Sequence, residues 1–304
     1  MNNSAMATNQ DALSALCNGD IHKAQSLFRI NAKESPCLYT YNNLGVFYLQ
    51  EGMVLRNGKT RRAGKTGMDL LKRAEAFGNH GLNHAAIARE YLKTGSVENA
   101  LFYYERACLS LRLYPVLNNY GVALYLANMF AKSSELFGEA VNCCNDADEK
   151  QGIIVSYAYS TLKIDKRKCH DIITRTVDST ALSSNMLDVD KFIILYFCDD
   201  FVTASKMQKQ LFDRYHVDCC TFAMIQDCLH RLAKADEAYE CLIRHIELLN
   251  GYDYDIRKEV ASAKRAYASC DYRRKLISEY ACCPSIIEQC YYCYCKQHDV
   301  ISEA

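Results

Sequence analysis

The sequence predicts an all-α protein, a right-handed α-solenoid of stacked antiparallel helix pairs, and three observations support this prediction. Only 3 of the 304 residues are proline and glycine is sparse, which favours long helices joined by short turns. Apolar residues recur at the i, i+3, i+4 and i+7 spacing of one helix face. Small and large residues also return at a nearly constant interval, which predicts a repeat architecture.

The segment of residues 41–48 shows the helical spacing most clearly. One of its faces is marked by four residues at that spacing: Tyr41, Leu44, Gly45 and Tyr48. The pattern returns at residues 117–124 and, more loosely, at residues 84–91. We therefore expect these three segments to be the first helices of successive units.

Each first helix is followed by a turn and then by a second helix, which carries a small residue and, four positions later, a large one. The small residues are Gly67, Ala100 and Ser133, and the large ones are Leu71, Tyr104 and Phe137. Both series advance in steps of 33 residues. Small residues let two helix backbones approach, and the large residues fill the remaining space.

In these features the chain resembles the tetratricopeptide repeat (TPR) family, whose repeat is about 34 residues long. The resemblance covers residues 11–145 and rests on a short set of positions: Leu44, Gly45, Tyr48, Ala100, Tyr104 and Ala107. A longer unit, in which residues 74–78 lead into Ala85 and Ala88, is similar to the Sel1 pattern. Ala88 stands where that pattern usually has glycine.

An insertion separates the first two units, because the step from Ala24 to Gly67 is 43 residues. The additional residues are assigned to a solvated basic loop at 53–66, whose cations are Arg56, Lys59, Arg61, Arg62 and Lys65. A phosphate-binding loop is not predicted, since five residues rather than four separate Gly58 from Gly64 and no strand is expected before them. One alternative function is a regulatory or nucleic-acid-associated protein that uses residues 56–65.

The sequence predicts three regions. Residues 11–145 are expected to form the TPR/Sel1-like repeats, and residues 146–250 to form divergent TPR-like helix pairs. Residues 251–304 are expected to form capping helices, the last of them starting at Pro284 and covering residues 285–296.

The family resemblance implies a concave groove lined by the first helices. Its predicted peptide-binding residues are Asn43, Val46, Gln50, Arg89, Lys93, Asn119 and Val122. By resemblance, Asn43 and Asn119 would hold the backbone of an extended peptide, because an amide offers both a donor and an acceptor. Arg89 and Lys93 would attract a carboxylate. These expectations imply a protein or peptide partner that is acidic where it meets the basic centre.

Cysteine is frequent, with 17 residues, and is interpreted as buried thiols that pack as small hydrophobic groups. The end of the chain holds four candidate zinc ligands: Cys290, Cys293, Cys295 and His298. On a continuous helix the first two would face away from the last two, so no metal site is predicted. A zinc-stabilised module is kept as an alternative.

Composition argues against other classes of function. The 36 basic residues balance the 36 acidic ones, so no net field favours nucleic acid or an anionic membrane. No apolar run is long enough to span a bilayer and residues 1–10 lack a secretory signal, so a cytoplasmic protein is expected. The triplet Cys169–His170–Asp171 has catalytic residue types, but neighbours on a helix point apart. The prediction is a scaffold or adaptor that is not an enzyme and has no cofactor; its oligomeric state is left open.

Overall fold

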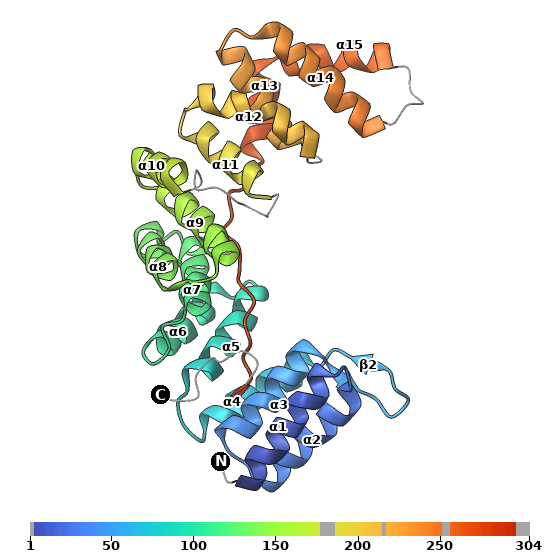
Figure 1. Cartoon of the computed structure of the whole chain (residues 1–304), viewed down its shortest axis with the longest axis vertical. Helices are drawn as coiled ribbons and strands as arrows, with labels where there is room; N and C mark the ends of the chain where they lie inside the picture. The colour runs from blue at the N-terminus through green and yellow to red at the C-terminus, as the bar shows by residue number, and fades with distance from the viewer. Residues whose placement is uncertain (1–2, 177–185, 215–216, 251–255, 296–304) are drawn as a thin grey trace. The chain divides into compact units, whose positions relative to one another are not determined.

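The computed structural model describes residues 3–176, 186–214, 217–250 and 256–295, and these form α-helices and one β-hairpin (Figure 1). The all-α solenoid prediction is therefore confirmed. The chain divides into two compact units, which we call unit 1 (residues 1–129 and 286–304) and unit 2 (residues 130–285). Among the described residues, no helix combines the length and the apolar character needed to cross a membrane.

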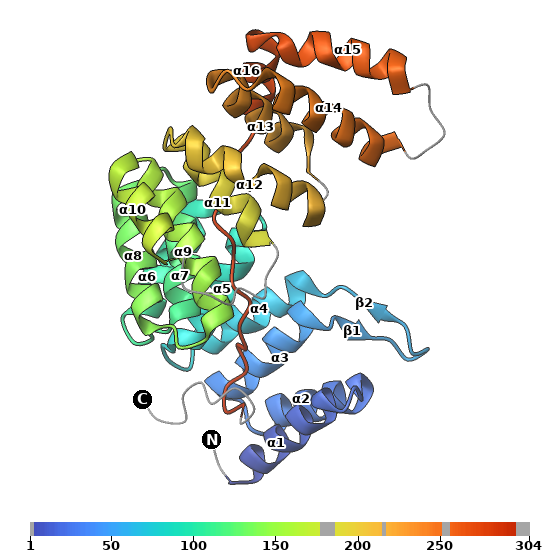
Figure 2. The ribbon, with the colours of Figure 1, turned by 45° about the horizontal axis from the view of Figure 1, so that its top comes forward.

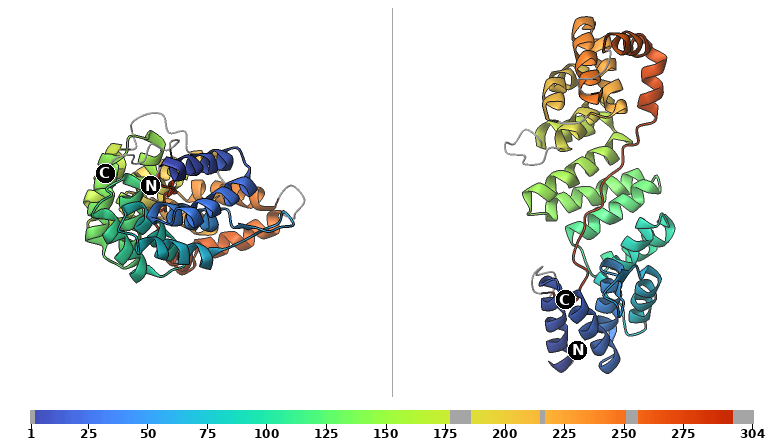
Figure 3. Two further views of the ribbon diagram at one scale, coloured as in Figure 1. Left: turned by 90° about the horizontal axis from the view of Figure 1, so that it is seen from below. Right: turned by 90° about the vertical axis from the view of Figure 1, so that its right-hand side faces the viewer.

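Unit 1 contains seven described helices. They are α1 (Asn3–Cys17), α2 (Ile21–Glu34), α3 (Leu38–Gln50), α4 (Gly64–Glu75), α5 (Gly81–Lys93), α6 (Val97–Cys108) and α7 (Tyr114–Leu126). The pairs α1 with α2, α3 with α4, and α5 with α6 pack together, and each pair also contacts the next. Figure 3 shows these pairs stacked in sequence order, from dark blue to teal. The first helices α3, α5 and α7 begin near residues 41, 84 and 117, as the repeat predicts.

The core of unit 1 uses the predicted small and large residues. A Cβ atom on Gly45 would lie 3.0 Å from the carbonyl oxygen of Gly67, and one on Gly67 would lie 2.9 Å from that of Gly45. Helices α3 and α4 can approach this closely only because neither residue has a side chain. Leu71 and Tyr104, the large members of their repeats, are buried.

The insertion between α3 and α4 is a β-hairpin, so the expectation of a loop without strands is wrong. Strand β1 (Met53–Val54) pairs antiparallel with β2 (Thr60–Arg61), and the backbone N–H of Val54 donates to the side chain of Gln25 at 2.9 Å. Gly52 precedes the hairpin with φ of 78°, a conformation that favours glycine. Figure 2 shows the hairpin projecting beyond α3. Residues 55–62 are exposed, as expected for a solvated insertion.

Unit 2 contains nine described helices. They are α8 (Phe130–Cys143), α9 (Ala147–Leu162), α10 (Lys166–Thr176), α11 (Met186–Phe197), α12 (Phe201–Arg214), α13 (Cys219–Arg231), α14 (Ala235–Asn250), α15 (Ile256–Ala268) and α16 (Cys270–Ser278). Consecutive helices again pack against each other. The buried carboxylate of Asp227 joins three of them, because it accepts from Tyr196 of α11 at 2.9 Å and from Arg273 of α16 at 3.2 Å.

The predicted final helix is absent, since residues 280–292 form neither helix nor strand. Tyr291, Tyr292 and Cys293 are buried in succession within this stretch. The backbone N–H groups of Ile287 and Cys293 bind asparagine side chains instead of carbonyls one helical turn earlier. The predicted region boundaries at 145/146 and 250/251 stay predictions.

Candidate peptide-binding groove

Four of the predicted groove residues contact an extended stretch of the same chain: Asn43, Arg89, Lys93 and Asn119. Residues 286–295, which we call the tail segment, run beside α5 and α3 in both Figure 1 and Figure 2. Hydrogen bonds connect this segment to α3, α5 and α7. These are the helices that the sequence assigns to the groove wall.

Asn43 on α3 binds both backbone groups of one tail residue. Its Oδ1 accepts from the N–H of Cys293 at 2.7 Å, and its Nδ2 donates to the carbonyl oxygen of Cys293 at 3.0 Å. Nδ2 also donates to Oδ1 of Asn9 at 2.7 Å, which fixes the orientation of the amide. Asn42 donates to the carbonyl oxygen of Tyr291 at 2.9 Å. The backbone of this buried part of the tail segment is thus paired by side chains.

Asn119 on α7 repeats the arrangement at the other end of the segment. Its Oδ1 accepts from the N–H of Ile287 and its Nδ2 donates to the carbonyl oxygen of Ile287, both at 2.8 Å. The two asparagines occupy the same position of their repeats, and the residues they hold are six positions apart. Together they fix the register and the direction of the segment.

The middle helix, α5, has Ala86 where α3 and α7 have asparagine, and it binds a side chain instead. Nη2 of Arg89 donates to the carboxylate of Glu288, and Nζ of Lys93 lies 3.3 Å from Oε1 of the same group. Arg89 is only 7% exposed and also pairs with Glu90 at 2.7 Å. Partial burial acts to raise the pKa of the Glu288 carboxyl, but the Arg89 hydrogen bond and the two cations hold that pKa below its usual value.

The aromatic residues of the tail segment fill the groove. Tyr291 and Cys293 are each 2% exposed. The ring of Tyr292 stacks on Phe28 of α2, with centroids 5.7 Å apart, and the ring of Tyr294 meets Tyr39 edge to face at 4.9 Å. Burial raises the pKa of the Tyr291 and Tyr292 hydroxyls well above the usual value, so both stay neutral.

Comparisons with known proteins bear on the fold. No family model matches the sequence, and no curated protein sequence does either. Among solved structures, a tetratricopeptide repeat protein from Parabacteroides merdae is similar with a TM-score of 0.54 and 11% identity, over 87% of this chain and 100% of that one. The pilF structure of Pseudomonas aeruginosa is similar with a TM-score of 0.51 and 17% identity, over 74% of this chain and 97% of that one.

The chain has the TPR fold. The predicted resemblance is confirmed at this level, whereas the Sel1-like character of residues 41–110 stays a prediction. The fold accounts for the repeated geometry, because equivalent positions of stacked helix pairs present their side chains to one curved surface.

The remaining predicted groove residues take other positions in this TPR groove. Val46 and Val122 are buried, with 2% exposed each, while Gln50 is exposed and has no hydrogen bond with the described part of the tail segment. Gln50 instead lines a polar cavity of about 870 Å³ next to the hairpin. The cations that line this cavity are Arg61, Arg62, Arg89 and Lys93. Peptide binding by the seven predicted residues stays a prediction.

Other residues at the groove did not follow from the helical spacing. Asn9 and Gln10 of α1 donate to the carbonyl oxygens of Cys293 at 3.4 Å and Tyr294 at 2.8 Å. Asn42 on α3, which donates to the carbonyl oxygen of Tyr291, is likewise not among the predicted groove residues. Paired asparagines occur at positions 42–43 and again at 118–119, and that repetition is a visible signal for Asn42, the first member of its pair.

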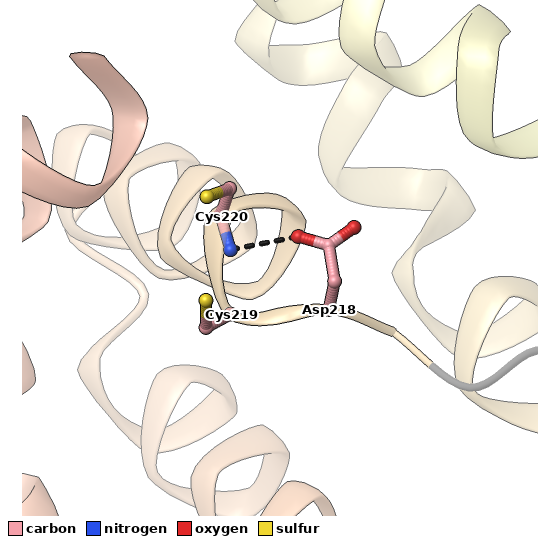
Figure 4. Close-up of side chains that lie close together, drawn as sticks. All are labelled: Asp218, Cys219 and Cys220. Carbon is pink, nitrogen blue, oxygen red and sulfur yellow. Dashed lines mark hydrogen bonds between the residues drawn. The ribbon is translucent and has the colours of Figure 1, made fainter. Parts of the chain in front are cut away.

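The candidate zinc ligands near the end of the chain are not placed on a continuous helix. His298 lies outside the described residues, and the extended tail segment removes the helical argument against its cysteines. Burial raises the pKa of the Cys293 thiol, and that of Cys290 to about 12, so both are neutral thiols in the metal-free chain. Elsewhere, ligand atoms of Asp218, Cys219 and Cys220 lie within 4.8 Å of one another (Figure 4).

In this second group, Asp218 has a structural role. Asp218 is the N-cap of α13, and its Oδ1 accepts from the backbone N–H of Cys220 at 2.8 Å and of Thr221 at 2.9 Å. Its Oδ2 accepts from the Thr221 hydroxyl at 2.9 Å. A carboxylate that satisfies a helix terminus in this way is an ordinary capping residue.

The candidate catalytic triplet is likewise divided among separate contacts. Cys169 is buried on α10, and its thiol donates to the carbonyl oxygen of Ala158 at 3.2 Å. Nε2 of His170 lies 3.0 Å from the carboxylate of Asp200, on the loop before α12. His170 therefore pairs with a residue other than its sequence neighbours.

Proposed function

We propose that this protein is a scaffold or adaptor that holds an extended segment of a partner protein in the groove formed by α3, α5 and α7. One observation supports this proposal above the others. Asn43 and Asn119, at the same position of two repeats, each hold the N–H and the carbonyl of a single residue in an extended chain. Recognition, without a catalytic step, is the proposed activity.

These asparagine hydrogen bonds are suited to binding a peptide from another protein. A peptide bound in a groove loses water from its N–H and carbonyl groups, and leaving them unpaired would cost free energy. An asparagine amide supplies one donor and one acceptor to one residue, whatever that residue's side chain is. Arg89 and Lys93 add a charged position between the two asparagines, which favours a partner with a carboxylate there.

A random-peptide display selection tests the proposal. The target is the full chain with Glu288→Lys, because a third cation beside Arg89 and Lys93 repels the tail segment and frees the groove. Selected peptides should bind this chain and should lose about tenfold or more in affinity when Asn43→Ala and Asn119→Ala are added, since each substitution removes two hydrogen bonds.

The matched control also replaces two asparagines by alanine. Asn18 follows α1 and Asn99 lies on α6, and both are exposed and have no side-chain hydrogen bond with the described tail segment. Asn18→Ala with Asn99→Ala should leave binding of the selected peptides unchanged. Equal binding by the groove variant and the control variant would show that the peptides bind elsewhere, and the proposal would then be wrong.

A further inference from the structure

The tail segment displays, position by position, what the groove accepts. We infer that the partner peptide has the chemistry of residues 288–293: an acidic residue, two residues without a required polar group, two aromatic residues and a small residue. We further infer that it binds by displacing the tail segment. This inference rests on the proposed function and adds the class of partner and the competitor that is built into the chain.

The acidic position follows from the burial of Arg89. A guanidinium that is 7% exposed needs an anion close by, because an unpaired buried charge is strongly unfavourable. Glu90 supplies one carboxylate at 2.7 Å, and Glu288 supplies the second while also reaching Lys93. A peptide without an acidic residue here would leave two neighbouring cations facing its own desolvated backbone.

The next position does not select for a polar residue. The side chain of Gln289 is half-buried, and both its amide nitrogen and its amide oxygen are enclosed without a hydrogen-bond partner among the described residues. An enclosed amide without a partner is a poor occupant of a protein interior. An apolar side chain of similar size, such as leucine, is therefore expected to bind at least as well.

The aromatic positions are set by ring contacts. Tyr291 is enclosed, with the guanidinium carbon of Arg89 5.8 Å from its ring centroid. Tyr292 stacks on Phe28 with an angle of 10° between the ring planes. Rings of this size bury a large area and stack with defined geometry, so tyrosine or phenylalanine fits both positions.

The requirement for a small residue at position 293 comes from the asparagines that bind its backbone. Asn43 holds both the N–H and the carbonyl of Cys293, and Nδ2 of Asn42 lies 3.3 Å from its Sγ. With 2% of this residue exposed, a larger side chain would have to push the asparagines away. Cysteine, alanine or serine satisfies the position.

Displacement follows from the covalent attachment of the tail segment. A segment tethered to its own binding site competes at an effective concentration on the order of millimolar. An external peptide then binds with an affinity reduced by the fraction of chains whose groove is free. A partner that outcompetes the tail segment must improve on it, and position 289, where the enclosed amide has no hydrogen-bond partner among the described residues, is one place where it can do so.

The test measures binding of a fluorescent peptide by anisotropy. The probe has the sequence of residues 285–295, with Cys293 replaced by alanine and the other two cysteines by serine. We expect the full chain with Glu288→Lys to bind this probe about tenfold or more tightly than the wild-type chain, because the charge reversal opens the groove. A Glu288→Gln chain should lie between the two, and all three should melt cooperatively by circular dichroism.

Three altered probes examine the motif on the Glu288→Lys chain. Lysine at the glutamate position and phenylalanine at the small position should each weaken binding about tenfold or more, through charge repulsion and overpacking respectively. Leucine at the Gln289 position should bind at least as tightly as the original. Equal binding of all four probes would mean that the groove accepts peptides without the inferred motif, and the inference would be wrong.

Two further results would contradict the proposed function or the displacement of the tail segment. If no probe bound the folded Glu288→Lys chain and no peptide was enriched on it by display, the groove would not bind peptides in trans, and the proposed function would fail as well. If the wild-type chain bound the probe as tightly as the Glu288→Lys chain, the tail segment would not compete, and the displacement would be refuted.

Discussion

Asn43 and Asn119 show how far a single residue type can be interpreted from sequence. Their place before a packing pair at residues 44–45 and 120–121 predicted that each amide would face a peptide backbone. Each does hold a backbone, and the occupant is the chain's own tail segment. That occupant was not predictable, because the contacts join residues 250 and 168 positions apart and leave no periodic signal.

Gly45→Ala tests the close approach of α3 and α4. The new Cβ would lie 2.9 Å from two atoms of Leu71 and 3.0 Å from the carbonyl oxygen of Gly67. Overpacking of this kind costs about 1–3 kcal/mol in the free energy of unfolding. Gly152→Ala on α9 is the control, since a Cβ there meets nothing within 4 Å, and it should stabilise by up to about 1 kcal/mol. Urea unfolding curves compare the two, and equal effects would refute the packing explanation.

His84→Gln tests a buried imidazole on α5. Burial, with the charge of Arg106, lowers the pKa of His84 to about 4. The ring is thus neutral at neutral pH, and its 3.4 Å approach to Glu75 is not an ion pair. Between pH 6.5 and 4 the unfolded chain takes up a proton that the folded chain does not, so stability falls as the pH falls.

The expected size of this effect is about 2 kcal/mol between pH 7 and pH 5. Urea unfolding at both pH values should show that His84→Gln removes this part of the loss, because glutamine does not protonate. His22→Gln, at an exposed position of α2, should keep the wild-type pH dependence. An unchanged loss in the His84 variant would mean that other groups cause it.

Prediction at the scale of elements succeeded where a long periodic pattern existed. The three first helices were predicted from apolar spacing over at least two turns. Strands β1 and β2 are two residues long each, which is too short for an alternating pattern, so the sequence predicts a loop for the insertion. The final helix failed for a different reason. Its aromatic and cysteine residues are compatible with a helix, and the contacts that stabilise the extended form come from residues far away in the sequence, such as Asn43 and Arg89.

The hairpin gives a prediction about charge. Arg61 and Arg62 line the same cavity as Arg89 and Lys93 and have no ion pair with the described residues, so they raise the positive potential beside the acidic position of the groove. In the Glu288→Lys chain, Arg61→Glu with Arg62→Glu should lower the affinity for the acidic probe about fivefold or more. The loss should shrink as salt is added.

Two other hairpin cations supply the control. Arg56 and Lys59 belong to the same exposed insertion but do not line the cavity. Arg56→Glu with Lys59→Glu changes the net charge equally and should have a clearly smaller effect on anisotropy titrations of the probe. An equal loss in both double variants would indicate a general charge effect of the hairpin. A loss of nucleic-acid binding in the first variant would support the alternative function.

At the scale of the whole molecule, the groove of unit 1 receives its occupant from a part of the sequence that follows unit 2. Unit 1 combines residues 1–129 with residues 286–304, so its tail segment joins it across the entire length of unit 2 in sequence. Contacts of such long sequence range form late and contribute little to local helix formation. The tail segment is also held by side chains, without helical or sheet hydrogen bonds of its own, which makes it the part of unit 1 that can leave at least cost.

Hydrogen exchange on the wild-type chain tests this difference directly. The amides of Ile287 and Cys293 donate to Asn119 and Asn43, so they should exchange more slowly than free amides but faster than the buried amides of α3 and α7. A saturating amount of the probe peptide should accelerate exchange in residues 286–295, because the probe replaces the tail segment, while α3 and α7 stay protected. The probe with lysine at the glutamate position should change nothing at the same concentration. Unchanged exchange of the tail segment in the presence of bound probe would place the probe outside the groove, because the two cannot pair with Asn43 and Asn119 at once.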